Sequence, residues 1–159
     1  MKSNVDKVKY IADMKFGNAN QKIAIKYIED HFKIVLKDEN IKVKEFPNTR
    51  SVFDYYVVGH NILIELKSRR NSILKYPTQM VGQNKIKYGR TKMRNNNTRI
   101  FFAFLLEATI SSKEKELYIY EDLSENILRT KECGNYARND KKDILCLINN
   151  RQLNLITSF

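Results

Sequence analysis

Apolar residues recur at helical or strand spacing along most of this chain. In residues 17–36 they lie three and four positions apart, which predicts an amphipathic helix. A second helix is predicted from Pro77 to about Tyr88, because proline favours the first helical turn and Gly89 is typical of a helix end. Segments with alternating or continuous apolar residues predict strands at 41–46, 52–58, 62–67, 99–106, 117–120 and 144–148.

The order of these elements predicts an α/β fold in which helices flank a mixed central sheet. Residues 122–143 are polar and irregular, and residues 152–156 are expected to form a closing helical turn. No repeat, linker or low-complexity segment divides the 159 residues. We therefore expect one domain, with a core of about 17–121 and a C-terminal extension of 122–159.

The composition narrows the class of protein. A hydrophobic fraction of 42% excludes a disordered chain, and two cysteines are too few for a disulfide scaffold. A polar N-terminus and the lack of a long apolar run favour an intracellular protein without a membrane partner. The net charge of +11 indicates a polyanionic partner, and nucleic acid is favoured over a membrane surface.

The charges are unevenly distributed. Residues 46–106 contain 11 basic residues and only two acids, Asp54 and Glu65. Two isolated carboxylates in a strongly positive segment are an unusual placement for residues that serve solubility. Their position therefore calls for a separate explanation.

A predicted hairpin brings these two acids together. Gly59 and His60 suit a two-residue type II′ turn, which would pair Asp54 with Glu65 across the two strands. Lys67 lies two residues beyond Glu65 and would point to the same face. The opposite face would carry the apolar side chains of Phe53, Tyr55, Val57, Ile62, Ile64 and Leu66.

Two opposed acids suggest a metal site. Like charges directly across a sheet are destabilising, and a divalent cation such as Mg²⁺ removes that repulsion. A bound cation would activate water, and Lys67 could orient that water or stabilise developing charge on a phosphodiester. In the alternative interpretation, Lys67 neutralises both acids on a solvated face.

The motif that these residues form resembles that of a known family. Phe53-Asp54, ten further residues and then Glu65-Leu66-Lys67 resemble the signature of the PD-(D/E)XK nucleases. That family has a restriction-endonuclease-like core in the order αβββαβ, which the predicted elements match over a little more than half the chain. Residues 64–69 and 76–78 also resemble small nucleases of phages and large DNA viruses, and resolvase-like members.

The resemblance implies a role for each residue of the motif. Asp54 and Glu65 would be ligands of Mg²⁺ or Mn²⁺, with the Leu66 carbonyl as a third, and Lys67 would be the catalytic lysine. Many members carry a helix glutamate that supports the metal or its water, and Gln21 occupies that position here. Glutamine supplies no charge, so this departure puts a tightly bound second metal in doubt. A partly exposed glutamine at a helix end is the alternative.

Further residues are candidates for nucleic-acid binding. Basic side chains that contact phosphates give salt-sensitive affinity without sequence preference. In this family, residues of the second helix often support catalysis as well. A solvated, lysine-rich helix face is the alternative for the residues of that helix, whereas Arg69 and Arg70 follow directly after the motif and are better placed to meet phosphate. The candidate residues are Arg69, Arg70, Gln83, Lys85, Lys87 and Arg90.

Together these features predict a metal-dependent endonuclease that hydrolyses phosphodiester bonds in DNA, with branched or junction DNA as a candidate substrate. A nucleic-acid-binding protein that kept the fold without cleavage is the main alternative, and Gln21 favours it. An RNA endonuclease and a homodimer also stay open. Nothing in the spacing supports catalysis by Cys133 or Cys146. His60 is expected to be exposed in the turn, and for His31 a partly buried surface position on the first helix is favoured over metal ligation.

Overall fold

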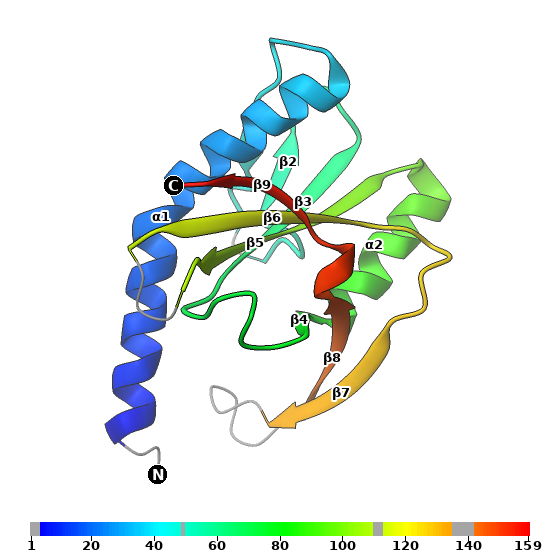
Figure 1. Ribbon diagram of the computed structural model, residues 1–159. Coiled ribbons are helices and arrows are strands. Elements are labelled where there is room, and N and C mark those ends of the chain that lie inside the picture. The colour runs from blue at the N-terminus through cyan, green and yellow to red at the C-terminus, as the bar shows by residue number, and fades with distance from the viewer. Residues whose placement is uncertain (1–3, 49, 110–112, 135–141) are drawn as a thin grey trace.

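The fold is built on a six-stranded mixed sheet (Figure 1). The computed structural model describes residues 4–48, 50–109, 113–134 and 142–159. The order across the sheet is β1-β2-β3-β5-β6-β9, in which β3 and β5 are parallel and the other neighbours are antiparallel. The strands are β1 (Val43–Glu45), β2 (Tyr55–Val57), β3 (Ile62–Ser68), β5 (Arg99–Glu107), β6 (Lys115–Asp122) and β9 (Asn154–Ser158).

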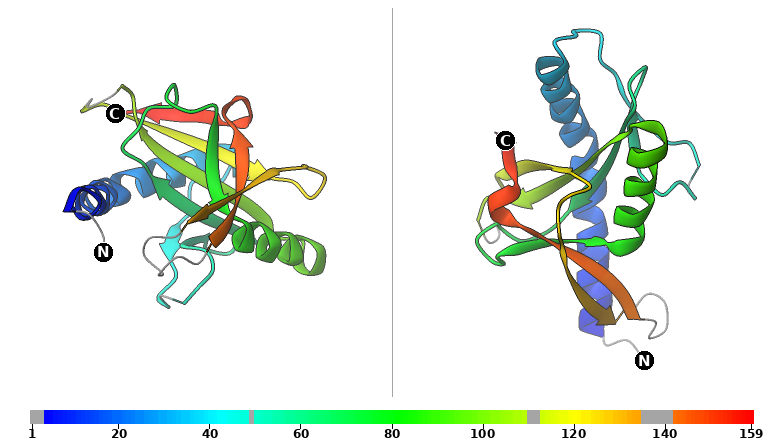
Figure 2. Two further views of the ribbon diagram at one scale, coloured as in Figure 1. Left: turned by 90° about the horizontal axis from the view of Figure 1, so that it is seen from below. Right: turned by 90° about the vertical axis from the view of Figure 1, so that its right-hand side faces the viewer.

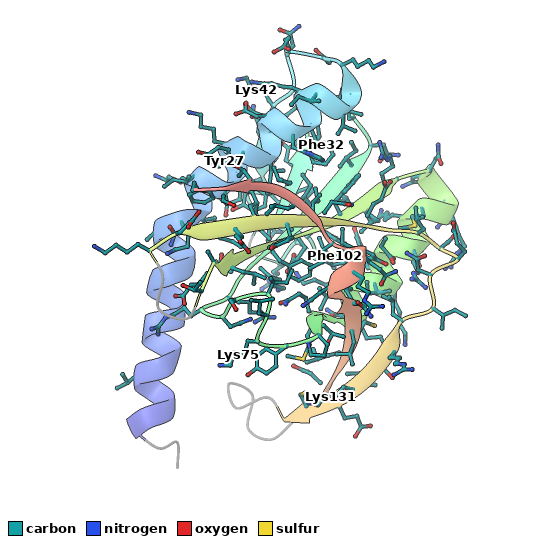
Figure 3. All side chains as sticks on the ribbon, in the orientation of Figure 1. Tyr27, Phe32, Lys42, Lys75, Phe102 and Lys131 are labelled. Carbon is teal, nitrogen blue, oxygen red and sulfur yellow. The ribbon has the colours of Figure 1, made fainter. Side chains whose placement is uncertain are left out.

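One helix covers each face of this sheet (Figure 2). Helix α1 (Asn4–Leu36) packs Ala24, Ile28 and Phe32 against the side chains that alternate along β3 and β5 on one face. Helix α2 (Gln83–Asn96) packs against the other face, together with Phe102 and its neighbours. Phe32 and Phe102, labelled in Figure 3, mark these two separate cores.

A second sheet of three strands packs on the α2 side. Its order is β4-β8-β7, all antiparallel, and Val81, Cys146 and Ile148 from it join the core around Phe102. Its strands are β4 (Thr78–Gly82), β7 (Arg129–Gly134) and β8 (Lys142–Asn149). The main sheet therefore has a helix on one face, and a helix with a small sheet on the other.

The predicted fold class is confirmed. The chain forms a mixed α/β structure whose central sheet is flanked by helices. The order α1, β1, β2, β3, α2, β5 is consistent with a restriction-endonuclease-like core, with β4 added before α2. Neither helix of the described part of the chain is long and apolar enough to cross a membrane.

The helix predicted from Pro77 is wrong in its position. Residues 78–82 form β4, because their alternating burial lets this segment pair along its whole length with β8. Helix α2 then runs past Gly89 to Asn96, and Asn97 takes the left-handed conformation that ends it. Gly89 instead lies inside the helix, where an added Cβ would come within 3.1 Å of the Ile100 side chain.

The C-terminal extension is more regular than its sequence suggests. Part of the segment expected to be irregular forms β7, and the predicted late strand is present as β8. The predicted closing helical turn is wrong, because a short 3-10 turn at Asn150–Gln152 leads into β9. Strand β9 pairs with β6, so the extension contributes strands to both sheets. Helix α1 also begins earlier than predicted, at Asn4.

Candidate active site

The hairpin of β2 and β3 has the predicted register. Tyr55 pairs with Ile64 and Tyr56 with Leu63, which is the pairing that the sequence predicts. The turn itself differs from the expected type II′. The His60 N–H donates to the Val57 carbonyl at 3.2 Å, and Gly59, with φ of 74°, occupies the second central position, as in a type II turn.

Asp54 lies just before β2, where the chain bends towards β3. The Leu66 N–H points to the Asp54 carboxylate, with 3.4 Å between the nitrogen and Oδ2. The bend also turns Phe53 into the core around Phe102, so the expectation that Phe53 shares a face with Tyr55 is wrong. Asp54 nevertheless stays beside Glu65, and the two carboxyl groups interact.

Glu65 is the buried centre of the cluster. Its neighbours Ile64 and Leu66 point into the core under α1, so alternation along β3 directs Glu65 and Lys67 to the α2 face. The Glu65 side chain is 1% exposed. Lys67 Nζ lies 2.5 Å from Oε1, and Lys85 Nζ lies 2.6 Å from Oε2. Glu65 therefore does not lie on a solvated face, whereas Asp54 is half-buried.

Lys85 enters this cluster from the first turn of α2. The next residue, Ile86, is buried in the core around Phe102, which fixes the rotation of the helix over the sheet. The Lys85 ammonium donates to the Val52 carbonyl at 2.6 Å as well as to Glu65. Two ammonium groups, from Lys67 and Lys85, thus surround a single buried carboxylate.

The environment of Asp54 disfavours its charged form. Burial, followed by the charge of Glu65, raises the pKa of Asp54 to about 6, although the ammonium groups of Lys85 and Lys67 act in the opposite direction. Two neighbouring carboxylates that share one site behave in this way when the local positive charge does not compensate both. An additional cation at this point would lower the pKa of Asp54 again.

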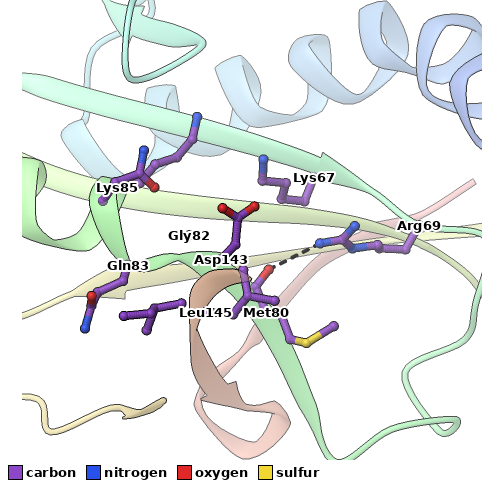
Figure 4. Close-up of a pocket in the computed structure, with 10 residues that line it drawn as sticks. Lys67, Arg69, Met80, Gly82, Gln83, Lys85, Asp143 and Leu145 are labelled. Carbon is purple, nitrogen blue, oxygen red and sulfur yellow. Dashed lines mark hydrogen bonds between the residues drawn. The ribbon is translucent and has the colours of Figure 1, made fainter. Parts of the chain in front are cut away.

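A cleft of about 570 Å³ opens beside these residues (Figure 4). Lys67, Arg69 and Lys85 line it together with the first residues of α2, whose N-terminal N–H groups favour anions. Asp143 on β8 faces them, and Figure 4 shows its carboxylate directed into the cleft. The small second sheet thus forms the far wall of the cleft.

A second hollow borders Asp54. It measures about 300 Å³ and is bordered by Glu45, Ser51 and Asp54 among others. Asp54 therefore faces one hollow, while Lys67 and Lys85 face the larger cleft. The residues of the cluster therefore border two different hollows.

The other predicted site residues lie outside the carboxylate cluster, some in the lining of the cleft and some away from it. Gln21 does not join the cluster, because its amide donates to the Tyr55 hydroxyl, and the Tyr55 side chain lies in the core under α1. Gln83 lines the cleft, and the Arg69 guanidinium, which also lines it, donates to the Met80 carbonyl at 3.3 Å. Arg70 and Lys87 are exposed residues outside its lining.

Arg90 has an internal partner. Its guanidinium forms a bidentate ion pair with Asp122, and it also donates to the Asn126 carbonyl at 2.8 Å. The Asp122 carboxylate is fully buried, so Arg90 neutralises it and joins α2 to the end of β6. This geometry gives Arg90 a structural role, and its contact with phosphate stays a prediction.

Asp143 was missed by the sequence analysis. It lies at the end of a segment interpreted as irregular, and no motif or spacing connects it with the hairpin. It reaches the cleft because β8 pairs with β4, which places it near the start of α2. Only this long-range pairing could have identified it.

The oxygen atoms of the cluster fit a small divalent cation. Glu65 Oε1 is buried and accepts no hydrogen bond from the described residues, since its contact with the Lys67 ammonium is an ion pair without hydrogen-bond geometry. The described residues contain no group of three His, Cys, Asp or Glu side chains that could hold a metal. Two carboxylates completed by a carbonyl and waters suit Mg²⁺ or Mn²⁺, which need few protein ligands.

The Leu66 carbonyl is oriented to take part. The Arg69 N–H bonds to Leu105 on β5, so backbone groups three residues earlier on β3 point away from β5. The Leu66 N–H indeed points to Asp54, and the carbonyl of the same residue leaves the strand on the same edge. The third expected ligand is therefore on the correct side of the strand.

Comparisons with known proteins add little to this geometry. No protein-family model matches the chain, and no curated protein matches its sequence. Among solved structures, it is similar to Hjc, a Holliday junction resolvase from the archaeal hyperthermophile Archaeoglobus fulgidus. The TM-score is 0.40 and the identity 12%, over 77% of this chain and 88% of that chain. This likeness is distant.

Proposed function

We propose that this protein is a nuclease that uses a divalent cation to hydrolyse phosphodiester bonds in nucleic acid. The observation that carries this proposal is the cluster of Asp54, Glu65 and Lys67 beside a positively lined cleft. Two carboxylates and one ammonium are the groups that such hydrolysis requires: anionic metal ligands, and a cation near the reacting phosphate.

In this proposal Asp54, Glu65 and the Leu66 carbonyl hold Mg²⁺ or Mn²⁺, which supplies Lewis-acid activation of the phosphate and of water. Lys67, which lines the cleft and contacts Glu65, directs its ammonium to the attacking water or to a phosphate oxygen. Burial of Glu65 keeps competing water away from one of its oxygens, which strengthens each of these electrostatic contacts.

Substrate binding is assigned to the walls of the cleft. Arg69, Gln83 and Lys85 line it, and the N-terminal N–H groups of α2 add a favourable site for phosphate. The net charge of +11 provides the long-range attraction for a polyanion. Exposed Arg70 and Lys87 extend the positive surface beyond the cleft.

We infer that DNA is the preferred substrate, with branched or junction DNA as the candidate shape, because the motif resembles that of DNA-processing nucleases. The second candidate function is nucleic-acid binding without cleavage. The position of Gln21 favours it, because this residue bonds to Tyr55 and adds no ligand to the cluster. An RNA substrate is the third alternative.

One assay separates these possibilities. Linear, branched and single-stranded DNA, and single-stranded RNA, are incubated with the protein in Mg²⁺, Mn²⁺ or EDTA, and the products are resolved on a gel. The nuclease proposal expects cleavage with either metal and none with EDTA. If the protein binds these nucleic acids but cleaves none of them with either metal, the nuclease proposal is wrong and the non-catalytic binding protein is supported. Asp54→Asn should fail to cleave under the same conditions, whereas Asp30→Asn, a change of an exposed acid on α1, is the matched control and should cleave like the wild type.

A further inference from the structure

The Lys85 ammonium lies among oxygen atoms, as a bound cation would. It donates to Glu65 Oε2 and to the Val52 carbonyl, both at 2.6 Å, and its side chain is 19% exposed. A carboxylate and a backbone carbonyl are also the oxygen types that bind Mg²⁺. Lys85 therefore occupies one oxygen of the carboxylate that the proposed function assigns to the metal.

The cluster already contains as many ammonium groups as carboxyl groups. Asp54 and Glu65 are opposed by Lys67 and Lys85, whose ammonium groups flank the two oxygens of Glu65. A divalent cation added to Glu65 would place three cationic groups on one buried carboxylate. Repulsion between like charges at such distances in a poorly solvated site is strong. One of the ammonium groups has to leave before the cation can bind.

Lys85 is the group that can leave. Lys67 follows Glu65 on the same strand, so β3 itself holds the two side chains together. Lys85 reaches Glu65 from a different element, α2, and its second partner is an uncharged carbonyl. It also lines the cleft, where a phosphate could replace both of its present partners.

We propose that Lys85 is a placeholder for the divalent cation. Without metal, its ammonium neutralises Glu65; metal binding displaces it into the cleft, where it contacts a phosphate of the nucleic acid. The proposal rests on the proposed function. Metal and nucleic acid should then bind cooperatively. Metal binding releases Lys85 from Glu65 and makes it available to phosphate, and a phosphate that binds Lys85 frees Glu65 for the metal.

The first test measures metal affinity without nucleic acid. Mn²⁺ is titrated into the wild type, Lys85→Gln and Lys85→Met, and binding is followed by calorimetry. Without the competing ammonium, both variants should bind Mn²⁺ about tenfold more tightly than the wild type, equivalent to about 1.4 kcal/mol. Lys87→Gln removes the same charge from an exposed position on the same helix, and its affinity should match that of the wild type. Equal or weaker binding by both Lys85 variants would overturn the proposal.

The second test uses the wild type and does not depend on how the variants fold. An amine-reactive acylating reagent labels exposed lysines, and mass spectrometry reports the labelling of Lys85 and Lys87. Saturating Mn²⁺ should increase the labelling of Lys85 several-fold and leave that of Lys87 unchanged. Lys85 that stays protected at saturating Mn²⁺ contradicts the displacement.

These tests also distinguish failure of the proposed metal site from failure of the role proposed for Lys85. Wild-type protein that binds no Mn²⁺, or binds it equally well after Glu65→Gln, refutes the proposed metal site and the placeholder with it. Binding that Glu65→Gln abolishes but that Lys85→Gln and Lys85→Met leave unchanged refutes the placeholder alone.

Discussion

Arg90 on α2 and Asp122 at the end of β6 form a bidentate ion pair, with Nε–Oδ2 and Nη2–Oδ1 distances of 2.9 Å each. The Tyr120 hydroxyl also donates to this carboxylate, at 3.2 Å, and Asn126 donates to the Tyr120 hydroxyl at 2.8 Å. Hydrogen bonding to Asp122 raises the pKa of Arg90. This network therefore connects α2, the helix on which Lys85 lies, with β6 of the main sheet.

Removing the Arg90 guanidinium from this network should destabilise the fold. Arg90→Gln leaves the buried Asp122 carboxylate without its charged partner, which typically costs about 3–5 kcal/mol. The free energy of unfolding, measured by urea denaturation, should fall by about that amount. Arg94→Gln, an exposed residue one turn further along α2, is the control and should change stability by no more than about 0.5 kcal/mol. If Arg90→Gln lowers the affinity for nucleic acid without lowering the free energy of unfolding, Arg90 contacts phosphate and has no structural role.

The local part of the site could be predicted from the sequence. The register of Tyr55 with Ile64 follows from the position of the turn and from the alternation of apolar residues, which are both short-range signals. The position of Lys67 beside Glu65 follows from the period of two along one strand. A one-residue slip would have moved Glu65 into the core under α1, so the hydrophobic pattern specifies the register.

The remainder of the site depends on long-range packing. Lys85 was predicted to contact nucleic acid, and its bond to Glu65 forms because α2, which follows a strand that the sequence analysis missed, packs against β5, the neighbour of β3 in the sheet. Pairing of that strand, β4, with β8 also brings Asp143 to the cleft. Gln21 shows the reverse case: a helix was predicted at this position and is present, but the face on which α1 packs separates Gln21 from the acids.

The two acids should be required for metal-dependent cleavage and not for folding. Asp54→Asn and Glu65→Gln each remove a proposed ligand, and we expect the rate of cleavage to fall by about a hundredfold to a thousandfold. Single-turnover cleavage in Mg²⁺ measures this rate, and circular dichroism checks the fold. Asp30→Asn should cleave like the wild type. Undiminished cleavage by either site variant would remove the assignment.

The raised pKa of Asp54 predicts a pH dependence of stability in the absence of metal. Since the pKa is about 6 in the folded protein and 3.8 ordinarily, the folded state binds the proton more tightly than the unfolded state. The contribution of Asp54 to stability should therefore fall as pH rises from about 4 to about 6, and stay low above that.

Thermal melting in EDTA of the wild type and Asp54→Asn, at several pH values between 4 and 7, tests this expectation. The variant lacks the titrating group, so its melting temperature should increase relative to that of the wild type as pH rises. Adding Mg²⁺ at pH 7 should raise the melting temperature of the wild type more than that of Asp54→Asn, because the cation binds the charged carboxylate. A melting-temperature difference that does not vary with pH would contradict the pKa of about 6.

The basic side chains around the cleft should differ in the effect of their removal: most should affect substrate binding, and one should affect the rate of cleavage. Arg69, Arg70 and Lys87 are not needed to activate water, and neutralising a residue that contacts phosphate should weaken the binding of different sequences about equally. It should also reduce the slope of log affinity against log salt by about 0.9 on duplex DNA, one counterion for each contact. Lys67→Ala should instead lower turnover far more than affinity, because its charge acts where transition-state charge develops. Binding in Ca²⁺ across a range of salt, paired with single-turnover cleavage in Mg²⁺, measures both effects. If saturating protein restores the full cleavage rate of Lys67→Ala, Lys67 belongs with the phosphate contacts and has no direct part in catalysis.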